Sequence, residues 1–123
     1  MKKYRLEDFK KGWFIGDFND TIHKTNQFEV AVKYYYCGEK DIKHFHKIAT
    51  EFTVIVFGKV RMNGITYYKG DILKIEPYFE TDFEALEETC TAVIKIPGVL
   101  DDKYLSKCRY FIFTFEVFYP ITI

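Results

Sequence analysis

Short apolar segments separated by turn residues occupy most of this chain, and they limit it to a fold built from strands. The segments are rich in Val, Ile, Phe, Tyr and Thr, which favour extended backbone, and Gly, Asn, Asp or Pro stands between them. The expected strands cover residues 28–36, 52–57, 60–62, 66–68, 72–75, 83–86 and 91–96. Short strands with turns at this frequency are typical of an all-β domain whose sheets close into a barrel or a sandwich.

The clearest local signal is the dipeptide Asn63-Gly64 between two of these strands. Both central residues of a two-residue hairpin turn take positive φ, which Asn and Gly adopt more readily than other residues. The sequence therefore predicts a tight antiparallel hairpin over residues 60–68.

Residues 38–58 carry a pattern of glycine, histidine and glutamate with a chemical meaning. The segment reads Gly-x5-His-x-His-x4-Glu-x6-Gly, with its polar members at His44, His46 and Glu51. Side chains two apart in a strand point to the same face, so the two imidazoles converge while Phe45 points away from them. Glu51 begins the next apolar strand after a short connection. Two histidines and one carboxylate form a facial ligand set for a divalent transition metal, with positions left open for water or substrate.

This pattern resembles the first signature of the cupin superfamily. The resemblance implies an all-β fold, a single jelly-roll-like cupin β-barrel with short N-terminal and C-terminal extensions. It implies one domain over residues 1–123, with the conserved barrel at about 28–96 and a C-terminal strand extension at about 108–120. It also implies a homodimer.

The second cupin signature, Gly-x5-Pro-x-Gly-x2-His, is degenerate here. Aligned from Gly70 without a gap, its proline falls on Glu76, its second glycine on Tyr78 and its histidine on Thr81. Strand alternation favours Thr81 inside the barrel and Asp82 outside, whereas a one-residue bulge would reverse the two. Which of them occupies the fourth ligand position is left open by the sequence, and water is expected to fill the remaining positions.

Composition excludes several classes of partner. Lys plus Arg and Asp plus Glu number 18 each, so no net charge attracts the chain to nucleic acid or to a membrane surface. The three cysteines, Cys37, Cys90 and Cys108, are widely spaced, and the first residues lack the apolar core of a signal peptide, so we expect a cytoplasmic protein with free thiols. No apolar run is long enough to span a bilayer, and no phosphate-binding loop or nucleophile elbow occurs.

Two segments near the end of the chain complete the expected structure. Residues 101–107 have the composition of a short helix, and residues 110–119 form an apolar, aromatic run. A strand of that composition is an aggregation hazard when exposed. We expect it to close its own barrel or to pair with a second subunit.

The functional hypotheses follow from the resemblance. One is a metalloenzyme of isomerase, epimerase or dioxygenase type, with carbohydrates among its candidate substrates and with iron, manganese, nickel or zinc held by His44, His46 and Glu51. The alternative is a noncatalytic module that binds a small molecule or carbohydrate, with the metal structural or absent. A third is a metal-independent epimerase in which a histidine acts as base and a tyrosine as acid. Whether the protein is an enzyme stays open.

Overall fold

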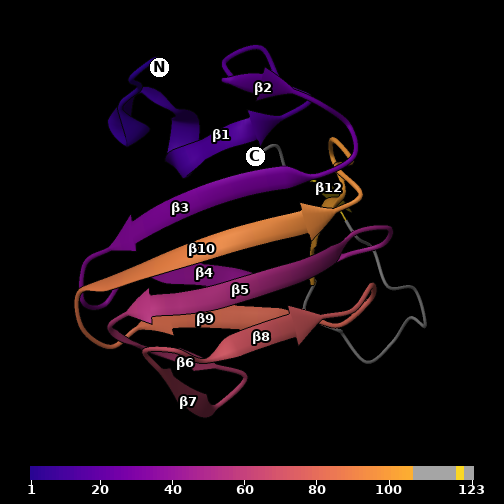
Figure 1. The fold of residues 1–123 in the computed structure, drawn as a ribbon. Helices are drawn as coiled ribbons and strands as arrows, with labels where there is room; N and C mark the ends of the chain where they lie inside the picture. Colours follow the sequence, from indigo (N-terminus) through magenta and orange to yellow (C-terminus); the bar gives the residue numbers. More distant parts are fainter. Residues whose placement is uncertain (107–118, 121–123) are drawn as a thin grey trace.

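Two six-stranded sheets face each other in the computed structural model, which describes residues 1–106 and 119–120 (Figure 1). The strand orders are β2-β1-β3-β10-β5-β8 and β12-β11-β4-β9-β6-β7. The all-β, jelly-roll-like prediction is confirmed. No helix in this described part is long and apolar enough to cross a membrane. The elements are η1 (Leu6–Asp8), η2 (Lys10–Gly12), β1 (Trp13–Gly16), β2 (His23–Lys24), β3 (Glu29–Tyr35), β4 (Lys40–His46), β5 (Thr50–Phe57), β6 (Lys59–Met62), β7 (Ile65–Tyr68), β8 (Ile72–Ile75), β9 (Thr81–Ala85), β10 (Thr89–Ile96), β11 (Lys103–Leu105) and β12 (Tyr119–Pro120).

The predicted hairpin is present. Strands β6 and β7 pair in antiparallel fashion from Lys59↔Tyr68 to Met62↔Ile65. Asn63 and Gly64 between them have φ values of 50° and 78°. Positive φ at both positions is what a turn matched to the twist of its strands requires.

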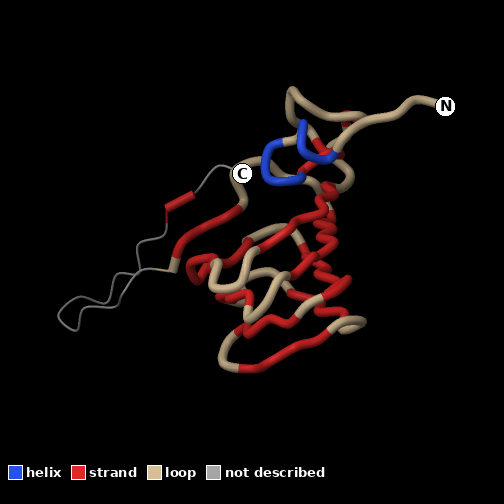
Figure 2. The backbone as a smooth tube through the Cα atoms, turned by 90° about the vertical axis from the view of Figure 1, so that its left-hand side faces the viewer, coloured by secondary structure: helices blue, strands red, loops and turns tan. Residues whose placement is uncertain are grey.

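The structure extends the predicted barrel at its amino end. Strand β1 pairs with β3, so the first sheet begins well before residue 28. The two short 3-10 turns that precede β1 lie at one end of the sheets (Figure 2). They form part of the rim of the interior.

The prediction of a helix over residues 101–107 is wrong for the residues of this segment that the structure describes. Residues Lys103–Leu105 instead form β11, which pairs with β4 through Lys103↔His46 and Leu105↔His44. Pairing satisfies the free backbone groups along the edge of β4, and this tertiary gain outweighs a weak local helix preference. Of the expected C-terminal extension, Tyr119–Pro120 form β12 beside β11. Residues 108–118 lie outside the described residues.

The interior is polar in its middle and apolar on either side. One core cluster consists of Ile55, Val60, Met62, Ile75, Phe83 and Ala85, and another of Trp13, Ala31 and Val93. Between them lies a cavity whose wall includes members of both clusters. The polar groups of the interior are thus held between two rigid apolar walls.

Strand β3 shows how the interior becomes polar. Its apolar alternate residues, such as Val30 and Val32, point away from the cavity, whereas Lys33 and Tyr35 line it. The side chain of Tyr34 is 66% exposed. The more apolar face of this segment is therefore the outer one, and the expected homodimer, which would cover part of such a surface, stays a prediction.

Candidate binding cavity

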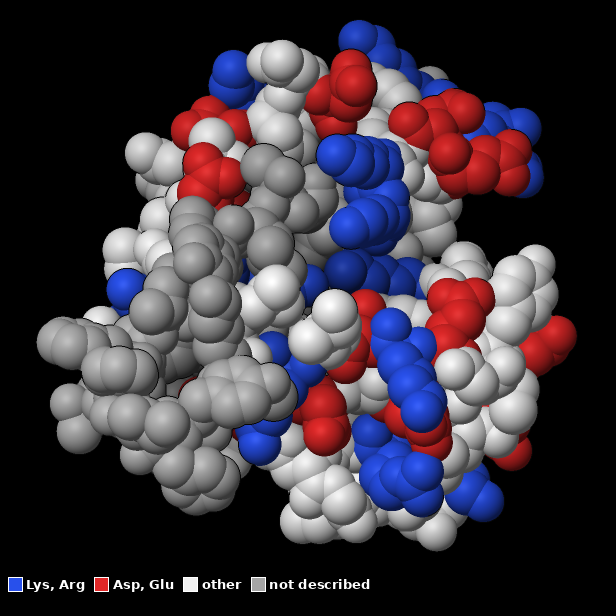
Figure 3. All heavy atoms as spheres, turned by 180° about the vertical axis from the view of Figure 1, so that it is seen from behind, with Lys and Arg blue, Asp and Glu red and all other residues white. Residues whose placement is uncertain are grey.

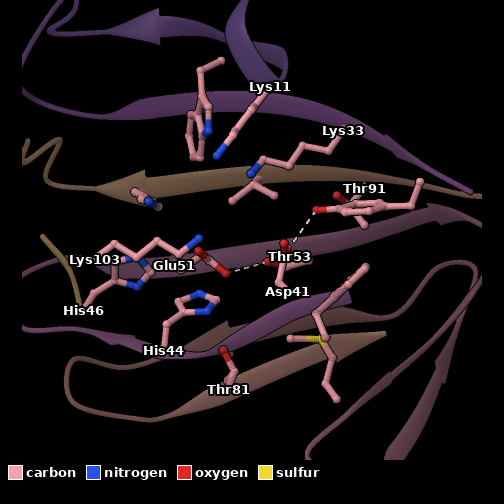
Figure 4. Close-up of a pocket in the computed structure, with 16 residues that line it drawn as sticks. Lys11, Lys33, Asp41, His44, His46, Glu51, Thr53, Thr81, Thr91 and Lys103 are labelled. Atoms are coloured by element: carbon pink, nitrogen blue, oxygen red, sulfur yellow. Dashed lines mark hydrogen bonds between the residues drawn. The ribbon is translucent and has the colours of Figure 1, made fainter. Parts of the chain in front are cut away.

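His44 and His46 project into the cavity from the end of β4, as strand alternation predicts (Figure 4). Their exposed fractions are 9% and 4%, and their ring centroids lie 5.6 Å apart with the planes at 83°. Phe45 points to the other side, where its ring stacks on those of Tyr78 and Tyr104 at 6.0 and 5.5 Å. The stacking fixes this end of β4 and hence the two imidazoles.

Both imidazoles are held in the neutral form. Burial lowers the pKa of His44, and it lowers the pKa of His46 to about 2, with the positive charge of Lys95 as the next cause. His44 Nδ1 lies 2.8 Å from the carbonyl oxygen of Ile42 and donates its proton there, which leaves Nε2 unprotonated in the neutral ring. His46 Nε2 is buried without a hydrogen-bond partner among the described residues. Each ring therefore has a nitrogen available to a ligand.

Two carboxylates also reach the cavity. Glu51, near the start of β5, points toward the histidines and accepts a hydrogen bond of 2.9 Å from Thr53 Oγ1 (Figure 4). Asp41 lines the same cavity although it is three residues from His44, because the pairing of β4 with β9 shifts register between these two residues. Such an irregularity turns a side chain to the other face. The Tyr35 hydroxyl donates to Asp41 Oδ2 at 3.5 Å.

Thr81 faces the cavity, as the ungapped alignment predicts. It is 6% exposed and lies directly opposite His44 in the antiparallel pair of β4 and β9. Asp82 is turned away, and its Oδ1 accepts a hydrogen bond from the backbone N–H of Asn63. Asp82 therefore stabilises the hairpin turn and takes no part in the cavity.

Four lysines line the cavity, and the sequence analysis missed all of them. They are Lys11, Lys33, Lys95 and Lys103, from four separate elements or turns. The ammonium groups of Lys11, Lys33 and Lys103 point into the same space (Figure 4). The alternation of β3 and β10 gives a sequence signal for two of them, since Lys33 and Lys95 lie on the same strand faces as the buried Ala31 and Val93.

The lysines differ in their surroundings. Lys95 is 5% exposed, with Nζ 4.0 Å from the fully buried carboxylate of Glu29. The Nζ atoms of Lys95 and Lys33 lie 4.7 and 5.0 Å from the centroid of the Trp13 ring, close enough for cation–π attraction. Burial lowers the pKa of Lys33 to about 8, and it also lowers that of Lys103.

An inner cavity and an outer cleft lie next to each other. The inner cavity, which contains the histidines, has a volume of about 80 Å³, and the cleft has about 750 Å³. They share Lys11, Lys33, Tyr35, Asp41 and Lys103. The N-terminal residues 3–12 supply much of the other side of the cleft. On the face opposite to that of Figure 1, Lys and Arg side chains gather along a hollow in the surface (Figure 3).

Comparison with known proteins identifies the fold to which this arrangement of strands belongs. No protein-family model matches the sequence, and no curated protein matches it. Among solved structures, a conserved protein with a double-stranded β-helix domain from Klebsiella pneumoniae superposes with a TM-score of 0.60 at 17% identity, covering 79% of this chain and 85% of that one. A cupin from Bacteroides fragilis gives a TM-score of 0.52 at 22% identity, covering 59% of this chain and 68% of that protein. This chain has the cupin fold. KdgF from Halomonas sp. also has a similar structure, with a TM-score of 0.54 at 18% identity, covering 59% of this chain and 72% of KdgF.

The donor set of this cavity does not, as arranged, complete a three-ligand metal site. Within residues 1–106 and 119–120, no three His, Cys, Asp or Glu side chains are grouped closely enough to hold a metal ion. The two neutral imidazoles suit a metal, but Glu51 is engaged with Thr53, and four lysines surround the space. Positive charges in the wall of the same cavity oppose the binding of a divalent cation. Metal binding by His44, His46 and Glu51 stays a prediction.

Proposed function

We propose that this cupin binds a small polar molecule that carries a carboxylate, with the carboxylate held by the lysines of the inner cavity. The observation that supports this most is the charge of the wall, where four lysines stand against the two carboxylates of Asp41 and Glu51. Charge-assisted hydrogen bonds from ammonium groups to a carboxylate are among the stronger polar contacts in proteins.

The electrostatics of the lysines favour an anion. Burial has lowered the pKa of Lys33 and Lys103, so in the free protein their charged forms are destabilised. A carboxylate bound beside the Lys103 ammonium group would offset this cost, and a cation would add to it. The neutral imidazole of His44 and the hydroxyl of Thr81 would then contact the neutral polar groups of the ligand.

The dimensions also support a small ligand. The inner cavity has room for one polar group, and the cleft of about 750 Å³ lies within the usual range for sites that bind small molecules. Catalysis is not required by this proposal. The same site could hold a ligand for chemistry or only for recognition.

Paired probes test the requirement for a carboxylate. D-Glucuronate and D-glucose differ by that group, as do lactate and 1,2-propanediol, and we expect only the acids to bind in calorimetric titrations. Lys103→Gln should weaken their binding about 10-fold to 100-fold, the loss expected for one charged hydrogen bond. Lys40→Gln, in the same sheet but exposed and paired with Glu84, is the matched control. Equal binding of the neutral partners, or no effect of Lys103→Gln, would contradict the proposal.

A mononuclear divalent metal at His44, His46 and Glu51 is the second candidate, within a metalloenzyme of isomerase, epimerase or dioxygenase type. The Nε2 atom of the buried His46, which has no hydrogen-bond partner among the residues that the structure describes, favours it, because neutral imidazole is the ligand form. Such an ion would supply Lewis acidity toward a carbonyl or hydroxyl group.

Elemental analysis of the purified protein tests the second candidate. This candidate predicts one equivalent of a transition metal in the wild type and a loss of at least 10-fold in His44→Gln/His46→Gln, because two ligands are removed. His23→Gln, an exposed histidine on β2, serves as the control. Equal metal contents in all three proteins would rule this candidate out.

A further inference from the structure

We propose that Lys33 forms a reversible imine with the carbonyl group of a small oxo acid bound in this cavity. The inference rests on the proposed carboxylate site and adds a reactive group to it. It narrows the ligand from any small acid to one that also carries an aldehyde or ketone.

Lys33 lies at the boundary between the inner cavity and the outer cleft. It is half-buried on β3 and lines both the inner cavity and the outer cleft. Its ammonium group points from β3 into the cavity, on the same side as that of Lys11 (Figure 4). A carboxylate held deeper in the cavity would leave the adjoining carbonyl carbon facing this amine.

The surroundings of Lys33 favour a neutral, nucleophilic amine. Within the described residues its Nζ makes no ion pair, and the ring of Trp13 lies 5.0 Å away. Burial is the main cause that lowers its pKa to about 8, and Lys103 and Lys95 act in the same direction, against Asp41 and Glu51. A lysine desolvated beside other cations is a recognised arrangement for imine chemistry. Lys95, by contrast, lies beside the carboxylate of Glu29.

The reaction needs no partner beyond the ligand. The Nζ lone pair attacks the carbonyl carbon, the C–N bond forms, and the π electrons of the carbonyl move to oxygen. A proton passes from nitrogen to that oxygen to give a carbinolamine. Loss of the oxygen as water, with a second proton, then produces the C=N bond. The reverse steps release the ligand unchanged.

Tyr35 and Asp41 are placed to handle the protons. Tyr35 is two residues after Lys33, on the same face of β3, and its hydroxyl donates to Asp41. Burial raises the pKa of the Tyr35 hydroxyl, so it stays a neutral donor. The pair can supply a proton to the departing oxygen and receive one from the nitrogen.

Reductive trapping tests the proposal with pyruvate as the probe. Wild-type protein is treated with pyruvate and sodium cyanoborohydride at neutral pH, and the modified lysine is located by peptide mass spectrometry. We expect Lys33 to be modified about 10-fold or more faster than exposed lysines such as Lys40, because far more of it is neutral. Lactate, which has a hydroxyl in place of the carbonyl, should slow trapping by competing for the site.

Two variants separate the charge from the nucleophile. Lys33→Arg keeps the positive charge but cannot form the imine, so it should still bind lactate while trapping falls to the level of exposed lysines. Lys40→Arg, at an exposed lysine outside the cavity, should leave trapping at Lys33 in place. Modification spread evenly over surface lysines would overturn the imine, as would unchanged total trapping in Lys33→Arg. Trapping at Lys33 without any binding of lactate would overturn the proposed carboxylate site and leave the imine standing.

Discussion

Replacing Asp102 by alanine is expected to lower the free energy of unfolding by about 3–5 kcal/mol, because it leaves one buried and two partly buried backbone donors without this acceptor. Asp102 is 5% exposed, and its carboxylate accepts hydrogen bonds of 2.9–3.2 Å from the N–H groups of Lys47, Ile48 and Ala49. These residues connect His46 to the strand that carries Glu51. The single carboxylate therefore holds together the turn on which the predicted metal ligands depend.

Urea unfolding at neutral pH measures the effect. Asp101→Asn is the matched control, since Asp101 is exposed and asparagine tolerates its φ of 56°. We expect that variant to stay within about 0.5 kcal/mol of the wild type, as surface changes usually do. A loss below 1 kcal/mol in Asp102→Ala would show that the turn keeps its shape without the carboxylate.

Acid is expected to destabilise the protein well above the pH at which most carboxylates titrate. His46 has an ordinary pKa of 6.5, and burial lowers it to about 2 in the folded state, so below pH 6.5 the unfolded chain binds the extra proton. Stability is then fully present above pH 6.5 and falls as the pH drops toward 2. One such group lowers the free energy of unfolding by about 1.4 kcal/mol per pH unit, or roughly 3 kcal/mol between pH 6.5 and 4.5.

The variant His46→Gln separates this contribution from the others. His44 acts in the same direction, whereas the raised pKa of buried Glu29 acts in the opposite one, so the slope of the wild type alone is not diagnostic. We expect His46→Gln to reduce the slope of unfolding free energy against pH by about 1.4 kcal/mol per pH unit, which corresponds to one proton. His23→Gln should leave the slope unchanged. Parallel slopes in wild type and His46→Gln would contradict the neutral buried state of His46.

Local features of the sequence were enough to predict the elements that depend on neighbours in the chain. The positive φ needed at Asn63 and Gly64 predicted the hairpin, and residues 72–75 form β8 as expected. The alternation of side chains placed His44 and His46 together and Phe45 opposite, and it placed Thr81 inside the barrel and Asp82 outside. Each of these follows from backbone geometry within a few residues.

The charge of the cavity came from tertiary structure. Lys11, Lys33, Lys95 and Lys103 are spread over nearly the whole chain, and only the pairing of the sheets brings them to one space. Isolated lysines in a sequence are usually solvated, and only the strand alternation around Lys33 and Lys95 gives a local sign that any of the four is buried. Their convergence places four lysines beside the predicted metal ligands, and it is the observation that supports the proposed carboxylate site.

What the sequence determined by itself is the fold class, the hairpin and the direction in which two histidines point, since these depend on backbone periodicity and turn chemistry. Three features were decided only by tertiary structure. The register shift in β4 turned Asp41 inward, strand pairing made β11 from residues expected to be helical, and Asp102 became the acceptor for a turn more than fifty residues earlier in the chain. In each case backbone groups found hydrogen-bond partners far away in sequence, and local propensity is too weak to oppose that gain.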